Sequence, residues 1–323
     1  METNPPTLNR NTVIIAVIVS ALVVTGLYNM FPYNMGYGLE PVTVFRNLRL
    51  MWFGAEMGEW RHCAFVPLVT LFFVWLDRQK LATTPVRSGS ADGLAALVFA
   101  GVVYWLGYKI DFTILGFLSL QITLGALLLW FFGRQFMRAI FFPWAFLVFA
   151  WPMPFINTNQ LSLIIAKISA HLLNFAGMDC LQEGVKIISA PKFAYGLRIA
   201  QGQLFSLEVA AACSGLRSLF ALMMVAALGG YLLLDKPWQR WVLFFCSIPL
   251  AMTGNVCRVV LLAFGAQMFG SEFAIGTEEH PSMYHLFAGY MIFVIALGGM
   301  FIIGWLLTGG WRAVARVCGF KLA

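Results

Sequence analysis

The stretch EVAAACSGLRSLFALMMVAALGGYLLL, Glu208 to Leu234, decides the class of this protein. From Val209 onward it is apolar and long enough for one membrane-spanning helix. A thiol, Cys213, lies a few residues inside the predicted helix start, and Arg217 follows one turn later. A cation at this depth costs roughly 2.5 to 3.5 kcal/mol on insertion scales, so an arginine in a span indicates a functional site. The thiol and the charge need a joint explanation.

The composition of the whole chain agrees with this reading. Of the 323 residues, 60% are hydrophobic and 11% charged, whereas a soluble domain has about 25% charged residues. We therefore predict an all-α fold, a polytopic membrane helix bundle that forms a single integral membrane domain over residues 1–323. The net charge of +7 lies mainly at span ends, which favours anchoring against anionic membrane lipids over nucleic-acid binding.

About eight transmembrane helices are predicted, and the charges of the loops orient them. The spans are 12–30, 62–76, 93–108, 112–133, 139–151, 209–234, 241–269 and 285–307. The first span is too long for a cleaved signal, and residues 31–61 are expected to form an external loop with an interfacial helix. The positive-inside rule assigns to the cytoplasmic side the basic clusters at 77–87, 134–138, 235–240 and 311–316. These assignments predict a multi-pass protein of the cell (inner) membrane with both termini in the cytoplasm.

Two segments before Cys213 do not read as ordinary spans. The helix predicted at 160–178 carries three polar side chains, Lys167, His171 and Asn174. A crossing would bury them and would move two basic segments to the outside, so the charges favour an interfacial or re-entrant amphipathic helix. Residues 181–207 show short alternating runs broken by glycine and proline, which predicts a small external hairpin.

The predicted topology brings three reactive side chains towards the external face. Cys213 lies about 7 Å inside a descending helix at 1.5 Å per residue, Arg258 lies in the outer half of an ascending one, and His285 opens the last span. A helix start and nearby cations favour a thiolate. An imidazole can carry protons to a leaving amine, and a guanidinium can stabilise an oxyanion. Together these groups indicate acyl transfer through a thioester.

Other polar residues are interpreted as supporting groups. Asn255 lies at i and i+3 from Arg258, so it shares a helix face with it and is expected to orient it. Two roles for Arg217 stay open, because it either tunes the thiol or neutralises Glu208 or a neighbouring carbonyl. Arg258 also has an alternative, a structural ion pair with an acid such as Glu208.

The remaining candidates carry weaker signals. His280 in GTEEHPSMYH competes with His285 as the acid and base, but a solvated loop explains it better. The spacing there fits no strong zinc pattern, and neither a metal nor a cofactor is expected. Cys246 and Cys257 are interpreted as packing residues.

Several motifs resemble the exosortase and archaeosortase family of membrane cysteine transpeptidases. They are AACSGLRSL (211–219), NVCR (255–258), HLFAGYMIF (285–293) and the run FFPWAFLVFAWPMPF (141–155). The resemblance covers roughly 134–307. It implies a catalytic core at 134–310, N-terminal spans of unclear role at 1–133 and a basic cytoplasmic tail at 311–323.

The resemblance also implies the chemistry and the partners. It gives the catalytic roles to Cys213, Arg258 and His285, and the histidine suggests the bacterial branch. The expected substrates are exported surface proteins with a C-terminal tripartite signal of the PEP-CTERM kind: a short motif such as Pro-Glu-Pro, a hydrophobic helix and a basic tail. The enzyme would cut near the motif and pass the new carboxyl end to an acceptor, whether amine, lipid or glycan, that the sequence does not identify.

Two alternatives from other functional classes stay open. The first is a transporter or channel whose polar path is lined by Arg217, Asn255 and Arg258. Against it, the chain lacks the internal repeats and paired broken helices typical of transporters. The second is a non-enzymatic partner in polysaccharide export, in which Cys213 would be dispensable.

Overall fold

The computed structural model describes residues 10–35, 41–54, 58–152, 158–194, 197–209, 216–276 and 282–310. Helices dominate, with a few short strands, and the chain divides into two compact units, Met1–Pro154 and Phe155–Ala323. The predicted all-α helix-bundle class is thus confirmed. The predicted boundaries of a core at 134–310 and a tail at 311–323 stay predictions.

Five helices in the described part of the chain are long and apolar enough to cross a membrane. They are α1 (Arg10–Asn29), α5 (Ala91–Lys109), α6 (Thr113–Ala139), α10 (Pro237–Phe269) and α12 (Met283–Leu307). Four shorter apolar helices cover Trp60–Leu76, Phe141–Ala150, Gln160–Phe175 and Ser218–Leu233. The predicted total of about eight spans therefore includes three of these shorter helices.

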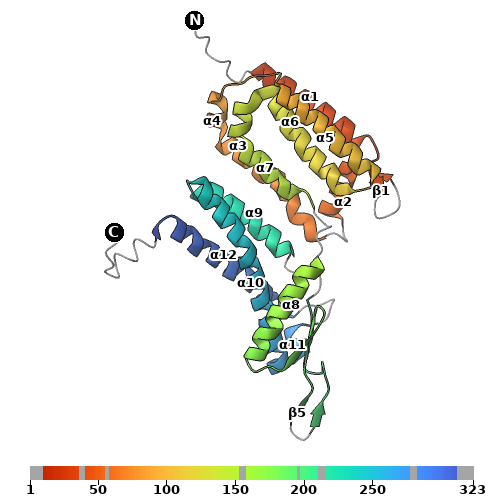
Figure 1. Cartoon of the computed structure of the whole chain (residues 1–323), viewed down its shortest axis with the longest axis vertical. Coiled ribbons are helices and arrows are strands. Elements are labelled where there is room, and N and C mark those ends of the chain that lie inside the picture. Colours follow the sequence, from red (N-terminus) through yellow and green to blue (C-terminus); the bar gives the residue numbers. More distant parts are fainter. Residues whose placement is uncertain are drawn as a thin grey trace. The chain divides into compact units, whose positions relative to one another are not determined.

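In the N-terminal unit, α1, α5 and α6 lie side by side, and shorter elements complete the unit (Figure 1). These are β1 (Asn34–Met35), β2 (Pro41–Val42), α2 (Val44–Phe53), the 3₁₀ helix η1 (Gly58–Phe65), α3 (Val66–Leu76), α4 (Arg78–Thr83), α7 (Phe141–Phe146) and the 3₁₀ helix η2 (Leu147–Ala150). The hydroxyl of Tyr28 on α1 lies 2.7 Å from Ser119 Oγ and 2.8 Å from Thr123 Oγ1, both on α6. Such bonds between helices help to fix neighbours that apolar packing alone would not distinguish.

Gln121 of α6 holds the segment predicted as the span 139–151. Gln121 of α6 donates to the carbonyl of Trp144 at 2.7 Å, and its Oε1 accepts from Trp151 Nε1 at 2.7 Å. The helical part, Phe141–Ala150, is about 15 Å long at 1.5 Å per residue. This is half of the roughly 30 Å hydrocarbon thickness of a bilayer.

In the C-terminal unit, α9 (Leu216–Leu233), α10 and α12 pack together, with α8 (Thr158–Phe175) and α11 (Ser271–Ala274) also against α10 (Figure 1). The hairpin predicted at 181–207 is present. It forms a three-stranded antiparallel sheet in the order β3-β4-β7 and a separate hairpin β5-β6. The strands are β3 (Cys180–Glu183), β4 (Lys186–Ser189), β5 (Lys192–Ala194), β6 (Leu197–Ile199) and β7 (Ser206–Glu208). The external position of this sheet stays a prediction.

The end of helix α8 is hydrogen-bonded to the first strand of the sheet. The Asn174 side chain accepts from Cys180 N at 2.8 Å and donates to Cys180 O at 3.1 Å. Its buried side includes Ile165 and Leu173, while Lys167 and His171 are exposed together with apolar residues such as Ile164. The interfacial or re-entrant placement of α8 stays a prediction.

Candidate active site

The site forms where the sheet meets the end of α10. One buried cluster joins Leu207 and Val209, at and just after β7, to Val256 and Val259 of α10 and to Ala288 of α12. Val256 and Val259 lie on either side of Arg258 along the helix. The chain that runs on from Val209 towards Cys213 therefore starts from the core that holds the Arg258 region.

Two glycines allow α10 and α12 to approach closely around this region. A Cβ on Gly254 would lie 3.0 Å from Ile292 Cγ2 and 3.2 Å from the Ile292 carbonyl oxygen. A Cβ on Gly265 would lie 2.5 Å from Cε1 and 2.8 Å from Cζ of Tyr284. The Tyr284 ring is fixed there because its hydroxyl donates to the Leu261 carbonyl at 2.9 Å.

Gly265→Ala is therefore expected to impair the site without removing a polar group from it. The new methyl group displaces the Tyr284 ring, and with it the start of α12, one residue before His285. We expect substrate cleavage to fall about tenfold to a hundredfold, since small misplacements of reacting groups carry such losses. Gly289→Ala is the control, because nothing lies within 4 Å of the added Cβ there. Equal cleavage rates for the two variants would contradict the close-approach argument.

Arg258 of α10 and His285 of α12 contact each other directly. Their Nη2 and Nε2 atoms lie 2.7 Å apart, and both side chains are partly buried. A guanidinium can only donate, so Nε2 of the histidine accepts, and the neutral imidazole then has its proton on Nδ1. The contact brings together two of the three residues predicted to be catalytic.

The start of α12 fixes the backbone of His285. Ser282 is the N-cap: its hydroxyl accepts from His285 N at 3.0 Å and donates to the Ala274 carbonyl at 2.9 Å. Such caps fix where a helix begins. The second bond ties this beginning to α11, so the backbone that carries the imidazole is anchored to the segment that follows α10.

Two polar atoms of the pair remain unsatisfied. Arg258 Nε and His285 Nδ1 are buried, and neither has a hydrogen-bond partner among the residues that the structure describes. A buried donor without a partner costs about 1 to 3 kcal/mol, and such groups call for an explanation such as a catalytic role. The pair therefore has two N–H groups available for a substrate or a neighbouring nucleophile.

Another polar contact joins α10 and α12 at their other ends. Gln239 Nε2 donates to the Leu307 carbonyl at 2.7 Å. Arg258 follows Gln239 by 19 residues, which is about 28 Å of helix at 1.5 Å per residue. That length is close to the roughly 30 Å hydrocarbon thickness, so the Arg258–His285 contact lies about one bilayer core away from the basic segment at 235–240.

The other predicted site residues are placed less completely. Cys213 and His280 lie outside the described residues, and Arg217 is the second residue of α9. Asn255 lies one turn before Arg258 and is 1% exposed. Glu208, at the end of β7, forms an ion pair with Lys186 of β4 at 3.3 Å, whereas Arg258 contacts His285.

Sequence patterns missed the residues that support the pair. Ser282, Tyr284 and Gly265 position the start of α12, but their signals are a serine before an apolar run and a glycine inside one, which are common in membrane proteins. The serine could have been recognised as a helix N-cap. Among the described residues, no group of three or more His, Cys, Asp or Glu side chains could hold a metal ion.

These features define a multi-pass membrane protein with a polar arginine–histidine pair near one end of an antiparallel helix pair. Comparison with protein families matches residues 55–302 to the transmembrane exosortases. The chain belongs to the transmembrane exosortase family, and this supports a membrane transpeptidase-type role in general terms. The match begins at residue 55, earlier than the start near 134 of the resemblance read from the motifs. No curated protein and no solved structure matches the chain.

Proposed function

We propose that this protein is a membrane cysteine transpeptidase that uses Cys213 as its nucleophile and the Arg258–His285 pair as its charge and proton machinery. The observation that carries the proposal is the 2.7 Å contact between Arg258 Nη2 and His285 Nε2, together with the two unsatisfied donors of the same pair. Family membership supports the reaction class. The shared core of Val209 and Val259 supports the inclusion of Cys213, which follows Val209 by four residues.

The contact suggests an order of events. At rest, the guanidinium of Arg258 occupies the lone pair of His285 Nε2. A scissile carbonyl that draws the guanidinium towards its oxygen frees this lone pair, and the imidazole can then take the thiol proton of Cys213. Arg258 is thereby aligned to stabilise the negative charge that develops on the carbonyl oxygen, and Asn255 orients it from the preceding turn.

The reaction forms a thioester on Cys213 and then resolves it. The sulfur of Cys213 attacks the carbonyl carbon, and the peptide C–N bond breaks to leave a thioester. The proton taken up by His285 goes to the leaving amine of the substrate's C-terminal fragment. An acceptor nucleophile, an amine or water, then attacks the thioester and restores the thiol.

The proposed substrates are exported proteins with a short motif, a hydrophobic helix and a basic tail. The roughly 28 Å between Gln239 and Arg258 matches a substrate whose helix crosses the bilayer with its scissile bond at the external side. Its basic tail would then remain at the cytoplasmic side, in agreement with the positive-inside rule.

The direct test is to trap the acyl-enzyme. The purified protein is incubated with a tripartite-tail substrate, quenched in acid and digested, and the peptide with Cys213 is examined by mass spectrometry. We expect this peptide to gain the mass of the substrate's new carboxyl end and to lose it with hydroxylamine, which cleaves thioesters. Substrate cleavage with the acyl group on another residue, or with no acyl group in a rapid-quench series, would overturn the assignment of Cys213.

A further inference from the structure

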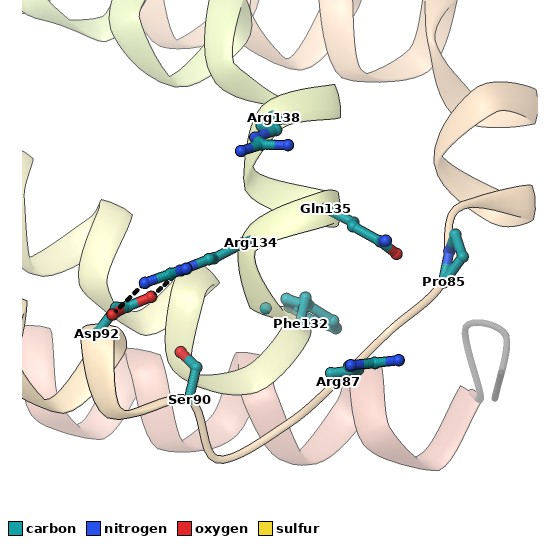
Figure 2. A pocket seen from close by; sticks show the side chains of 9 residues that line it. Pro85, Arg87, Ser90, Asp92, Phe132, Arg134, Gln135 and Arg138 are labelled. Carbon is teal, nitrogen blue, oxygen red and sulfur yellow. Dashed lines mark hydrogen bonds and ion pairs between the residues drawn. The ribbon is translucent and has the colours of Figure 1, made fainter.

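A basic pocket of about 360 Å³ lies in the N-terminal unit, and none of the residues proposed above for catalysis lines it. It forms where the connection between α4 and α5 runs past a break in α6 (Figure 2). Three arginines line it, Arg87 from the connection and Arg134 and Arg138 from the end of α6. Asp92, on the first turn of α5, is the acidic group in the lining, so the pocket has a net charge of +2.

The backbone holds the pocket in shape. Arg87 N donates to the Phe132 carbonyl at 3.1 Å, and Gly89 N donates to the Trp130 carbonyl at 2.8 Å. Directly after Phe132 the helix is broken at Gly133, which has φ 83°. A Cβ there would lie 2.6 Å from the Arg87 carbonyl oxygen, so both the left-handed conformation and the close approach require glycine.

The three guanidinium groups are not equivalent. Arg134 donates to both carboxylate oxygens of Asp92, with 2.7 Å between Nη2 and Oδ1, and Figure 2 shows this pair at one side of the pocket. Arg87 and Arg138 are exposed and form no ion pair with any residue for which the structure gives a side chain. Two uncompensated cations therefore share one pocket with a third that is already oriented.

The position of the pocket suggests what fills it. It lies at the ends of α5 and α6, two helices of membrane-spanning length. Leu94 and Phe141, which follow the pocket residues Asp92 and Arg138 within one helical turn, are 52% and 51% exposed. At the headgroup boundary of a bilayer, apolar side chains contact the acyl chains and cationic pockets contact the lipid headgroups. The exposed apolar side chains beside this basic pocket fit that position. A basic segment, such as the tail of a substrate, is disfavoured there by the net positive charge.

We propose that this pocket binds the phosphate of an anionic phospholipid headgroup. Arg87 and Arg138 donate to the phosphate oxygens, since the planar guanidinium fork matches phosphate geometry. Arg134 stays in its fixed position on Asp92, which balances its charge. Basic pockets between transmembrane helices bind lipid headgroups in this way. The bound lipid links the connection after α4 to the broken end of α6, and so stabilises the N-terminal unit.

The test measures lipid binding by the purified full-length protein in a neutral detergent. Phosphatidylglycerol, phosphatidylcholine and inorganic phosphate are added separately, bound lipid is counted by native mass spectrometry, and the unfolding temperature is followed in parallel. We expect phosphatidylglycerol alone to bind and to raise the unfolding temperature. Arg87→Gln with Arg138→Gln should weaken its binding by about tenfold or more, given the contribution of each cation near a lipid surface.

A charge-matched double variant is the control. Arg78→Gln with Lys80→Gln removes the same charge from α4, outside the pocket lining, and should leave phosphatidylglycerol binding close to wild type. Equal losses in both double variants, or no preference for phosphatidylglycerol, would overturn the proposal. If inorganic phosphate raises the unfolding temperature as much as phosphatidylglycerol does, the pocket binds a soluble anion and the lipid proposal is wrong.

If the glutamine double variant does not fold, the double variant Arg87→Lys with Arg138→Lys tests the proposal instead. It keeps both charges but lacks the guanidinium fork, so reduced binding is expected. Wild-type affinity in this variant would contradict the guanidinium–phosphate contact.

Discussion

Cys213→Ala is expected to leave a co-expressed tripartite-tail substrate at full length, while the wild-type protein trims it. The substitution removes the atom that forms the thioester, and no other group proposed for the site can replace it. Removal of the nucleophile from a covalent mechanism lowers the rate by about 10⁴-fold or more. The length of the substrate, followed by mass spectrometry of the membrane and released fractions, measures the effect.

Two other cysteines provide matched controls. Cys246 and Cys257 are free, partly buried thiols in α10, and Cys257 is the sequence neighbour of Arg258. Cys246→Ala and Cys257→Ala should therefore trim the substrate at close to the wild-type rate. Equal trimming by wild type and Cys213→Ala would remove the enzyme proposal, and would favour the transporter or export-partner alternatives, in which the thiol is dispensable.

Arg258→Gln and His285→Ala are each expected to slow cleavage by about 10²- to 10⁴-fold. The range is that for the loss of an oxyanion donor or of a general acid and base. Because the two side chains contact each other at 2.7 Å, they act as a unit. The double variant should lose less than the product of the two single losses. Initial cleavage rates in proteoliposomes measure all three.

The control for charge removal lies on the same helix. Arg240 of α10 donates to the Leu234 carbonyl at 2.8 Å, near the other end of that helix, so Arg240→Gln should leave cleavage nearly unchanged. Arg258→Lys tests geometry, because it keeps the charge without the guanidinium fork, and it should be impaired. A similar loss in Arg240→Gln and Arg258→Gln, or independent effects of Arg258 and His285, would argue for a structural role of the pair.

The features predictable from the sequence are those with local signals. Membrane-length apolar runs predicted α1, α5, α6, α10 and α12 to within a few residues, and alternating residues broken by glycine predicted the hairpin after α8. Loop charges and motifs placed Arg258 and His285 near the same membrane face, but their direct contact was not predicted. Polar residues inside apolar helices are rare and costly, which is why Arg258 and His285 could be singled out from the sequence.

The features that escaped prediction depend on contacts between distant segments. The short helix pair α7–η2 is held by Gln121 of α6, and the break in α6 is held by the backbone at Arg87. Nothing within either segment indicates its partner. The N-cap by Ser282 had a local signal, but its second bond to Ala274 requires the fold of the loop. Nor does the sequence indicate which glycines permit close contact between helices.

The polar contacts between α10 and α12 have a consequence for how a substrate reaches the site. The Arg258–His285 bond fastens the pair near one end and the Gln239–Leu307 bond fastens it near the other. We expect the two helices to move as one rigid unit. An incoming substrate helix is therefore not expected to enter between α10 and α12.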